Sequence, residues 1–387
     1  MNSVERKAFV TEKFTERFGT APELWSRAPG RVDLMGSHTD YNLGYVMTMT
    51  IDRDTWIAAR PRDDRKVAIY SLDVDGGGEF DLDQIEHDAA APWTNYVRGI
   101  AKYLQAAGYS LTGFDGFVHS TVPFGSGVSS SAALEMAVGV MFQLVSSVQI
   151  DPVQMALIGQ QAENKFVGVN SGILDQYSSA MGQAGCALLL DCKHLTSRSV
   201  PIAESLHVVI CDTRAKRTLA GTEYGERRAQ CEQGVRLLQQ WNPDIAALRD
   251  TTLEQFASHE KELPHIVARR CRFIIEENQR VLDLAEALST VDTVRLNQLF
   301  AASYAGARDQ YEIGAPAMEV MMRAMLSGPG VVAARQAGAG FGGCLVALVQ
   351  QSRVEAFADR VTRAYAAEMA IEPKVYPVQA APGAGPL

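Results

Sequence analysis

The chain is short of positive charge. Its 36 Lys and Arg residues are outnumbered by 45 Asp and Glu residues, so the net charge is −9, and no long basic run interrupts this balance. We therefore expect neither a nucleic acid nor an anionic membrane as a partner. Phosphate binding, if the protein has it, must come from local backbone geometry.

Cysteine motifs and long apolar runs are missing too. The six cysteines are scattered without a CxxC pair, which argues against a zinc site or a disulfide framework and favours buried thiols in a reducing compartment. No apolar run reaches membrane-spanning length. Residues 1–19 form an amphipathic, charged pattern without the apolar centre of a signal peptide. We expect a cytoplasmic monomer.

The length of 387 residues suggests two domains. A glycine-rich, loop-rich half gives way to a helical half near residues 195–205, so we predict domains at 1–200 and 201–387. Other expectations are strands at 45–52 and 55–62, helices at 130–147 and 151–169, and a frayed tail at 378–387.

Residues 28–45, APGRVDLMGSHTDYNLGY, hold the densest polar chemistry of the first hundred residues. Arg31, His38 and Asp40 stand close together among turn-forming residues. The segment is either a polar loop between strands or a pocket wall, where a bent backbone lets several polar side chains converge on a small molecule.

A second motif, VPFGSGVSSSAALEMA at 122–137, leads from a glycine-rich loop directly into a helix. The free N–H groups of a first helical turn attract anions, and glycines let a ligand approach the backbone, so this pattern favours phosphate binding. A serine-rich helix cap without a ligand is the alternative. No Lys follows the glycines, so the loop is not a Walker A motif.

The run GAGFGG at 338–343 matches the dinucleotide pattern G-x-G-x-x-G, with Asp359 about twenty residues further on. The following CLVALV indicates a strand instead of a helix, and Asp359 lies within a helical pattern. A dinucleotide-dependent oxidoreductase is therefore not expected. The run is better explained as a loop that packs against the phosphate loop or the substrate.

Two carboxylates follow in AENKFVGVNSGILDQYSSAMG, residues 162–182. Glu163 and Asp175, taken singly, are typical of a solvated surface. Together with a phosphate loop they suggest more, because one carboxylate can hold Mg²⁺ and another can orient or deprotonate an attacking hydroxyl. That set is what phosphoryl transfer to an alcohol requires.

The ordered motifs resemble those of the GHMP small-molecule kinases, and within them the galactokinases. GRVDLMGSHTDYNLGY is similar to the galactokinase signature GRVNLIGEHTDYNGGY, and PFGSGVSSSAAL is similar to the GHMP phosphate motif PxGxGLSSSAA. The segments GILDQ, EYGERRAQC, IIEENQRV and GAGFGGC match further blocks. The resemblance runs from about Trp25 to Val349.

This resemblance implies an α+β fold with an S5-like N-terminal domain and a ferredoxin-like C-terminal domain. It implies an ATP- and Mg²⁺-dependent kinase for the anomeric hydroxyl of a galactose-type sugar. Asp175 would be the base or anchor for that hydroxyl, and Arg31 would stabilise the transferring phosphoryl group. Ser131 and Glu163 would be the Mg²⁺ ligands.

The resemblance also implies the binding residues. The ATP phosphates would lie against Gly125, Ser126, Gly127, Val128, Ser129, Ser130 and Ser131. The sugar would lie against Ser37, His38, Thr39, Asp40 and Tyr224.

One departure bears on the sugar. Galactokinases usually carry Glu, facing the C6 hydroxyl, where this chain has Ser37, and Asn where it has Asp33. A neutral serine could contact the C6 hydroxyl of galactose through a water molecule. It would also avoid repelling a C6 carboxylate, as in galacturonate, and it would suit a pentose such as L-arabinose, which has no C6. With galactose as substrate, Ser37→Glu would be neutral or beneficial. A non-catalytic sugar sensor is a further alternative, but the retained Arg31, Glu163 and Asp175 argue against it.

Overall fold

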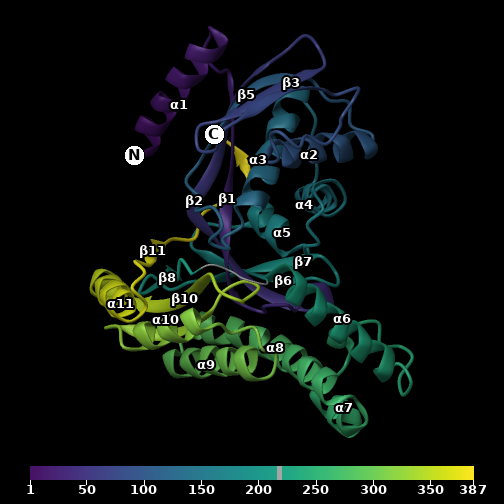
Figure 1. The fold of residues 1–387 in the computed structure, drawn as a ribbon, viewed down its shortest axis with the longest axis vertical. Helices are drawn as coiled ribbons and strands as arrows, with labels where there is room; N and C mark the ends of the chain where they lie inside the picture. The colour runs from purple at the N-terminus through teal and green to yellow at the C-terminus, as the bar shows by residue number, and fades with distance from the viewer. Residues whose placement is uncertain (216–219) are drawn as a thin grey trace.

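The computed structural model describes residues 1–215 and 220–387, which build two β-sheets with helices packed on them (Figure 1). The strands are β1 (Leu24–Met35), β2 (Tyr45–Pro61), β3 (Lys66–Ser71), β4 (Gly77–Asp81), β5 (Phe114–Ser120), β6 (Cys186–Asp191), β7 (Thr196–Pro201), β8 (Leu206–Asp212), β9 (Val331–Gln336), β10 (Cys344–Gln350), β11 (Lys374–Val378) and β12 (Gly385–Pro386). The α-helices are α1 (Ser3–Phe18), α2 (Thr94–Ala106), α3 (Ser130–Ser146), α4 (Pro152–Gln161), α5 (Leu174–Met181), α6 (Ala220–Leu238), α7 (Leu253–His259), α8 (His265–Thr290), α9 (Thr293–Asp309), α10 (Pro316–Leu326) and α11 (Val354–Met369). None of these described helices is long and apolar enough to cross a bilayer.

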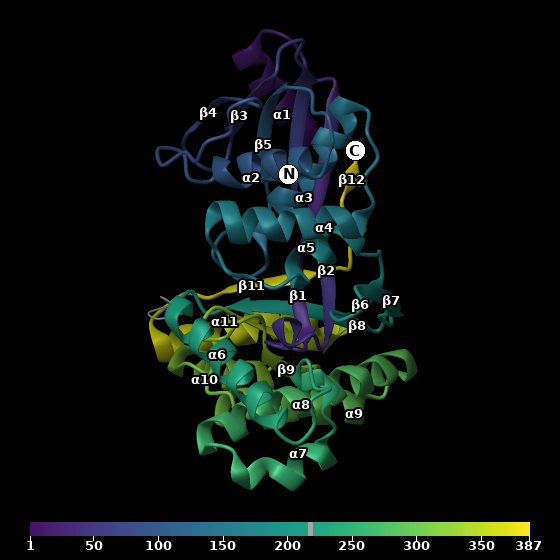
Figure 2. The same cartoon turned by 90° about the vertical axis from the view of Figure 1, so that its right-hand side faces the viewer.

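The first sheet has the order β12-β1-β2-β5-β3-β4, with β6 pairing to β2 and β7 to β6. The second has the order β11-β8-β10-β9 and is antiparallel. In Figure 2 the second sheet lies across the lower ends of β1 and β2 and above α8 and α9. The expected α+β class is confirmed.

Strand β2 is one long strand where two were expected. Residues 53 and 54 were predicted to separate two strands, but they remain in β2, because β1 pairs with β2 on both sides of this point. A bulge takes up the extra residues: Pro29 faces Asp54 while Arg31 faces Thr50. Bulges re-aim side chains next to functional sites, and this one immediately precedes Arg31.

The core is continuous between the sheets. Alternate residues of β8 divide between two faces, as the two-residue period of a strand requires: Val209 and Cys211 pack with α10 and α11, while Val208 and Ile210 pack with α8, α9 and the ends of β1 and β2. Helix α3 is buried nearly all round, as its run of apolar helix-forming residues predicts.

The C-terminal tail is ordered, so the expected frayed end was wrong. Strand β12 pairs with β1, and the amide of Leu387 donates to the carbonyl of Trp25 at 3.1 Å. Arg27 Nη1 donates to the carbonyl of Gly383 at 3.0 Å. Figure 1 shows the C-terminus beside the first sheet, although the residues before it build the second sheet. The domain limits 1–200 and 201–387 stay a prediction.

Candidate active site

Most of the predicted site residues line one cavity of about 730 Å³. It is lined by the end of β1 and the loop after it, the loop before α3, residues 168–175, α6 and the β9–β10 loop. Both halves of the chain therefore contribute to its wall. Arg31 lines it together with Glu163 and Asp175, which belong to a segment far from Arg31 in the sequence.

Arg31 and Asp175 form an ion pair in this wall. Arg31 Nε donates to Asp175 Oδ1 at 2.7 Å, and Nη2 contacts the same oxygen. Arg31 Nη1 donates to the carbonyl of Gly127 at 2.9 Å, and the Arg31 amide donates to the carbonyl of Val128 at 3.1 Å. One side chain thus joins the carboxylate to the glycine-rich loop. The Asp175 side chain is 28% exposed, so a hydroxyl in the cavity can reach it.

The loop before α3 presents its backbone to the cavity. Gly127 has φ +79° and Ser129 has φ +60°, left-handed conformations that turn the chain into the helix. Ser130 and Ser131 begin α3, and the Ser129 hydroxyl has no hydrogen-bond partner among the described residues. Helical N–H groups and serine hydroxyls are thereby gathered at one place, an arrangement that suits an anion.

Ser126 and Val128, predicted on the same loop, do not line the cavity, whereas Gly125 does. The Ser126 hydroxyl donates to Asp212 Oδ2 at 2.6 Å, and the Val128 side chain joins the core between the sheets. These two side chains anchor the loop to the second sheet and leave only their backbone for a ligand.

Glu163 lies on a π-helical turn, Ala162–Val167, where a continuous α-helix was expected. Such turns are frequent at functional sites. Glu163 Oε2 accepts hydrogen bonds from Gln176 Nε2 at 2.9 Å and from the hydroxyl of Ser171, and the Ser131 side chain also hydrogen-bonds to this carboxylate. Burial raises the pKa of Glu163, so a nearby cation would favour its ionised form.

Asp40 stands in the cavity wall with open acceptor positions. Gly172 makes room for it: a Cβ atom there would lie 1.8 Å from Asp40 Oδ2. Burial, together with the neighbouring negative charge of Asp175, raises the pKa of Asp40 to about 6. An ionised Asp40 offers two oxygens to sugar hydroxyls.

His38 also lines the cavity, but both ring nitrogens have protein partners. Burial lowers the pKa of His38 to about 4, so the ring is neutral at pH 7. Nε2 lies 2.9 Å from the carbonyl of Ala339 and must donate, which leaves Nδ1 to accept from the Tyr41 hydroxyl at 2.8 Å. His38 is therefore positioned to shape the pocket, and a role as a general base does not fit.

The remaining predicted sugar-site residues differ in placement. Ser37 and Tyr224 line the cavity, and the Tyr224 ring is tilted against the His38 ring with 5.2 Å between centroids. Thr39 does not line it: its hydroxyl lies 2.6 Å from the carbonyls of Gly36 and Tyr45 and holds the loop closed. The Ser37 hydroxyl donates to Asp33 Oδ2 at 2.7 Å.

Sequence reasoning missed several contributors. Gln176 donates both to Glu163 and, at 2.8 Å, to the fully buried Glu135, so it fixes the Glu163 carboxylate from behind. Its only signal was its place after Asp175 in GILDQ. Asn170 also lines the cavity, and nothing in its local sequence set it apart.

The GAGFGG run connects the antiparallel strands β9 and β10, which excludes a strand-to-helix dinucleotide loop. Gly338 and Ala339 line the cavity, and Ala339 also contacts His38. The loop packs close to the phosphate loop, as expected, because a Cβ atom on Gly338 would lie 3.8 Å from the carbonyl oxygen of Gly127.

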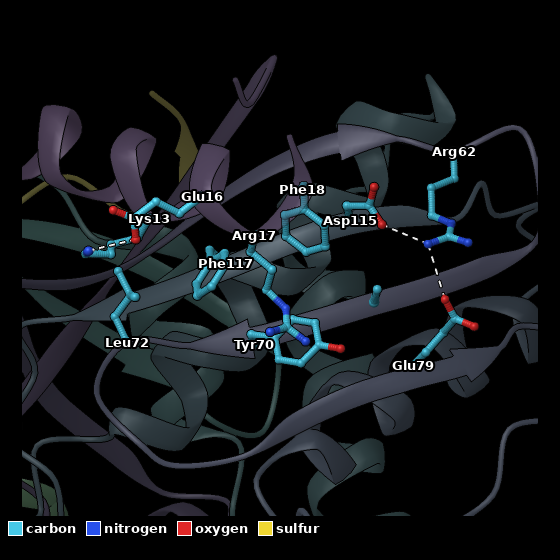
Figure 3. Close-up of a pocket in the computed structure, with 11 residues that line it drawn as sticks. Lys13, Glu16, Arg17, Phe18, Arg62, Tyr70, Leu72, Glu79, Asp115 and Phe117 are labelled. Atoms are coloured by element: carbon cyan, nitrogen blue, oxygen red, sulfur yellow. Dashed lines mark hydrogen bonds and ion pairs between the residues drawn. The ribbon is translucent and has the colours of Figure 1, made fainter. Parts of the chain in front are cut away.

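A second, more open cavity of about 820 Å³ lies between α1 and the first sheet (Figure 3). Arg62 pairs there with Asp115 at 2.8 Å and with Glu79 at 3.3 Å, and the Arg17 guanidinium lies 3.3 Å from the centre of the Tyr70 ring. These cations are satisfied by neighbouring acids and rings. The cavity of about 730 Å³ that Arg31 and Asp175 line is therefore the better candidate for catalysis.

Three family profiles match the chain. The galactokinase galactose-binding signature matches residues 12–61, the GHMP kinases N terminal domain matches 95–183, and the GHMP kinases C terminal profile matches 284–367. The first profile covers the segment that carries Arg31, Ser37 and Asp40. The second covers the phosphate loop, Glu163 and Asp175.

Whole-chain comparisons agree. The chain is 44% identical to a galactokinase of Roseiflexus sp. (strain RS-1), covering 97% of this chain and 96% of the relative. It is 43% identical to a galactokinase of Chloroflexus aurantiacus, covering 96% and 95%. A solved structure of Lactococcus lactis galactokinase complexed with galactose superposes with a TM-score of 0.93 at 34% identity, covering 98% of this chain and 99% of that one.

A solved mevalonate kinase shares only the fold, with a TM-score of 0.64, 15% identity, and 92% of this chain and 99% of that chain covered. At this identity the likeness shows the fold alone. The family assignment rests on the three profiles and on the 43–44% identity to galactokinases over nearly the whole chain. The chain belongs to the galactokinase family of GHMP kinases.

Proposed function

We propose that the protein transfers the γ-phosphoryl group of ATP to the anomeric C1 hydroxyl of galactose. The observation that carries this proposal is the Arg31–Asp175 pair, which faces the cavity and is hydrogen-bonded to the glycine-rich loop before α3. Galactose is assigned as the sugar because the relatives of the chain are named galactokinases. Galacturonate and L-arabinose are the alternatives that share the same chemistry.

Each polar group has a defined task in this proposal. Asp175 accepts the C1 hydroxyl of the sugar and orients or deprotonates it for in-line attack. Arg31 neutralises charge on the phosphoryl group as it moves between ATP and sugar. Phosphoryl transfer needs little covalent help, so positioning and charge neutralisation are sufficient.

The residues near the phosphate loop fit Mg²⁺. Ser131 and Glu163 both line the cavity and hydrogen-bond to each other, so a hydroxyl and a carboxylate are available at one place. Mg²⁺ commonly takes one or two protein oxygens and completes its shell with water and nucleotide phosphates. Bound there, it would neutralise charge on the phosphates of ATP.

A sugar panel tests the proposal. ADP release should be fastest with galactose and much slower with galacturonate, L-arabinose, N-acetylgalactosamine and glucose. Tight galactose binding without ADP release would indicate a sugar sensor. A faster reaction with another sugar of the panel would replace galactose as the substrate.

The metal assignment predicts a selective defect. Ser131→Ala combined with Glu163→Gln should raise the Mg²⁺ concentration needed for half-maximal rate about tenfold or more, since both groups are removed from the cation. Galactose binding, measured by calorimetry without nucleotide, should be unchanged. Glu254→Gln, at an exposed position of α7, serves as the control. Equal losses of metal and sugar binding would refute the assignment.

The raised pKa of Asp40, about 6, predicts a pH effect on the sugar. Below that pH Asp40 gains a proton and loses acceptor capacity, so kcat/KM for galactose should fall about tenfold per pH unit. Folding does not explain this loss: a carboxyl whose pKa is raised by folding contributes more stability as the pH falls through 6. The KM for ATP should stay flat, and Asp40→Asn should remove the transition. An unchanged transition in that variant would assign it to another group.

The expectations of a cytoplasmic location and a monomeric state stay predictions. Gel filtration with light scattering would settle the second directly.

A further inference from the structure

The β1–β2 loop, residues 36–44, brings polar side chains to the cavity. Ser37, His38 and Asp40 all come from it. Helix α8, from the second half of the chain, lies beneath the lower ends of β1 and β2 (Figure 2). The place of this loop in the cavity wall therefore depends on what α8 offers to it.

Two adjacent residues of α8 hold the two ends of the loop. At its start, the amide of Gly36 donates to Glu277 Oε1 at 3.1 Å. Just after its end, the amide of Tyr45 donates to Asn278 Oδ1 at 2.8 Å. Glu277 is fully buried and Asn278 is 8% exposed, and neither lines the cavity. Without these acceptors both backbone amides would lose their partners, which is costly for a buried group.

Gly44 shows how closely the loop approaches α8. A Cβ atom at position 44 would lie 2.3 Å from Asn278 Oδ1 and 2.9 Å from Thr39 Cβ. Gly44 is not among the glycines with a positive φ, so the turn itself does not require glycine there. The missing side chain makes room for Asn278 and Thr39. The contact between the loop and Asn278 is thus built into both segments.

Glu277 also belongs to a buried charge cluster with Arg335 and Asp33. Glu277 Oε1 accepts from the hydroxyl of Ser303 at 2.7 Å and lies 3.4 Å from Arg335 Nη2. Arg335 Nη2 also donates to the hydroxyl of Ser37 at 2.8 Å, and Arg335 Nη1 lies 3.7 Å from Asp33 Oδ1. A substitution of Glu277 would therefore leave buried charges unbalanced as well as free the loop.

We propose that Glu277 and Asn278 are positioning residues for the sugar: they fix both ends of the β1–β2 loop and thereby the places of His38 and Asp40 in the cavity wall. This inference rests on the proposed kinase function. It gives a task to the segment IIEENQRV, which does not line the cavity. Among the described residues, neither side chain hydrogen-bonds to the glycine-rich loop before α3, so the effect falls on the sugar and leaves the nucleotide side unchanged.

The test uses Asn278, because it lies outside the charge cluster. Asn278→Ala should weaken galactose binding about tenfold, measured by calorimetry without nucleotide, since the amide of Tyr45 loses its acceptor. The affinity for MgADP should stay at the wild-type value. Asn278→Asp keeps the acceptor oxygen, and the nitrogen that it replaces has no hydrogen-bond partner among the described residues, so galactose binding should return to near the wild-type value.

Val267→Ala is the matched control. Val267 is buried in the first turn of the same helix, where it packs with residues of α6 and α7. This variant should lower the melting temperature and leave galactose affinity unchanged. An unchanged galactose affinity in Asn278→Ala, or an equal loss of galactose and MgADP affinity, would overturn the inference.

Two further outcomes are also decisive. If Asn278→Ala does not fold, Asn278→Ser takes its place, because a serine side chain ends one atom short of the position of Asn278 Oδ1. If the wild type binds another sugar of the panel and does not bind galactose, the proposed function fails. The same variants compared with that sugar then decide the inference by the same criteria.

Discussion

Asp175→Asn is expected to reduce kcat about 10²- to 10⁴-fold, the range for loss of a general base or positioning carboxylate. The replacement keeps the shape of the side chain and removes its charge. Arg31 then has no ionised partner, and the C1 hydroxyl of the sugar loses its acceptor. Because the Asp175 side chain is 28% exposed, water can compensate Arg31 and the fold should persist.

The measurement is kcat at saturating galactose and MgATP, together with the melting temperature and the galactose affinity. The melting temperature should move by only a few degrees, and galactose should still bind. Asp244→Asn, an exposed position outside the cavity, controls for the chemistry of the substitution. Near wild-type turnover in Asp175→Asn would show that another group orients the attacking hydroxyl.

Ser37→Glu, which introduces the residue usual in galactokinases, should strongly lower both the stability of the protein and its activity. Ser37 is 2% exposed and its hydroxyl lies between Asp33 and Arg335, so the new carboxylate would meet Asp33 in a buried cluster whose cations are already shared. An uncompensated buried charge typically costs about 3–5 kcal/mol. The expected result is a loss of stability on that order and a fall in kcat/KM for galactose.

Adding Asp33→Asn should rescue Ser37→Glu. The double variant has one carboxylate facing the C6 position, as galactokinases usually do, and the charge balance of the cluster is restored. The measurement is a double-mutant cycle in unfolding free energy and kcat/KM, in which the two substitutions should compensate strongly. Additive effects would show that positions 33 and 37 do not share one charge.

The sequence alone led to the opposite expectation for Ser37→Glu. Nothing in the local pattern shows that Arg335, 298 residues away, donates to Ser37. Asp33 was noted only as a departure from the usual Asn. The effect of Asp33 on the site depends on which charged groups surround it in the folded protein. The periodicity of the sequence carries no information on such long-range contacts.

Local signals predicted local features well. Helix-forming residues after Ser130 predicted α3, and Pro152 stands in the first turn of α4, where the fixed φ of proline suits a helix start. The motifs around Arg31, Gly127, Glu163 and Asp175 predicted one site because their chemistry is complementary, and the structure places all of these residues at one cavity.

Features that depend on tertiary pairing were not predicted. Residues 53 and 54 were expected to separate two strands, but pairing with β1 on both sides of them keeps β2 continuous. The small, flexible residues of 378–387 indicated a frayed end, but β1 offers an open edge to which β12 binds. The hydrogen bonds of both His38 ring nitrogens were not predicted either, because their partners, Tyr41 and Ala339, come from different parts of the chain.

The most direct test of the account is the position of the phosphate in the product. Galactose, ATP and Mg²⁺ should be incubated with the protein, and the sugar product examined by phosphorus–proton correlation NMR. The account predicts equal amounts of ADP and a galactose phosphate whose phosphorus couples to the proton at C1, with none formed by Asp175→Asn on the same timescale. Coupling to the C6 protons, or ADP release without a sugar phosphate, would contradict it.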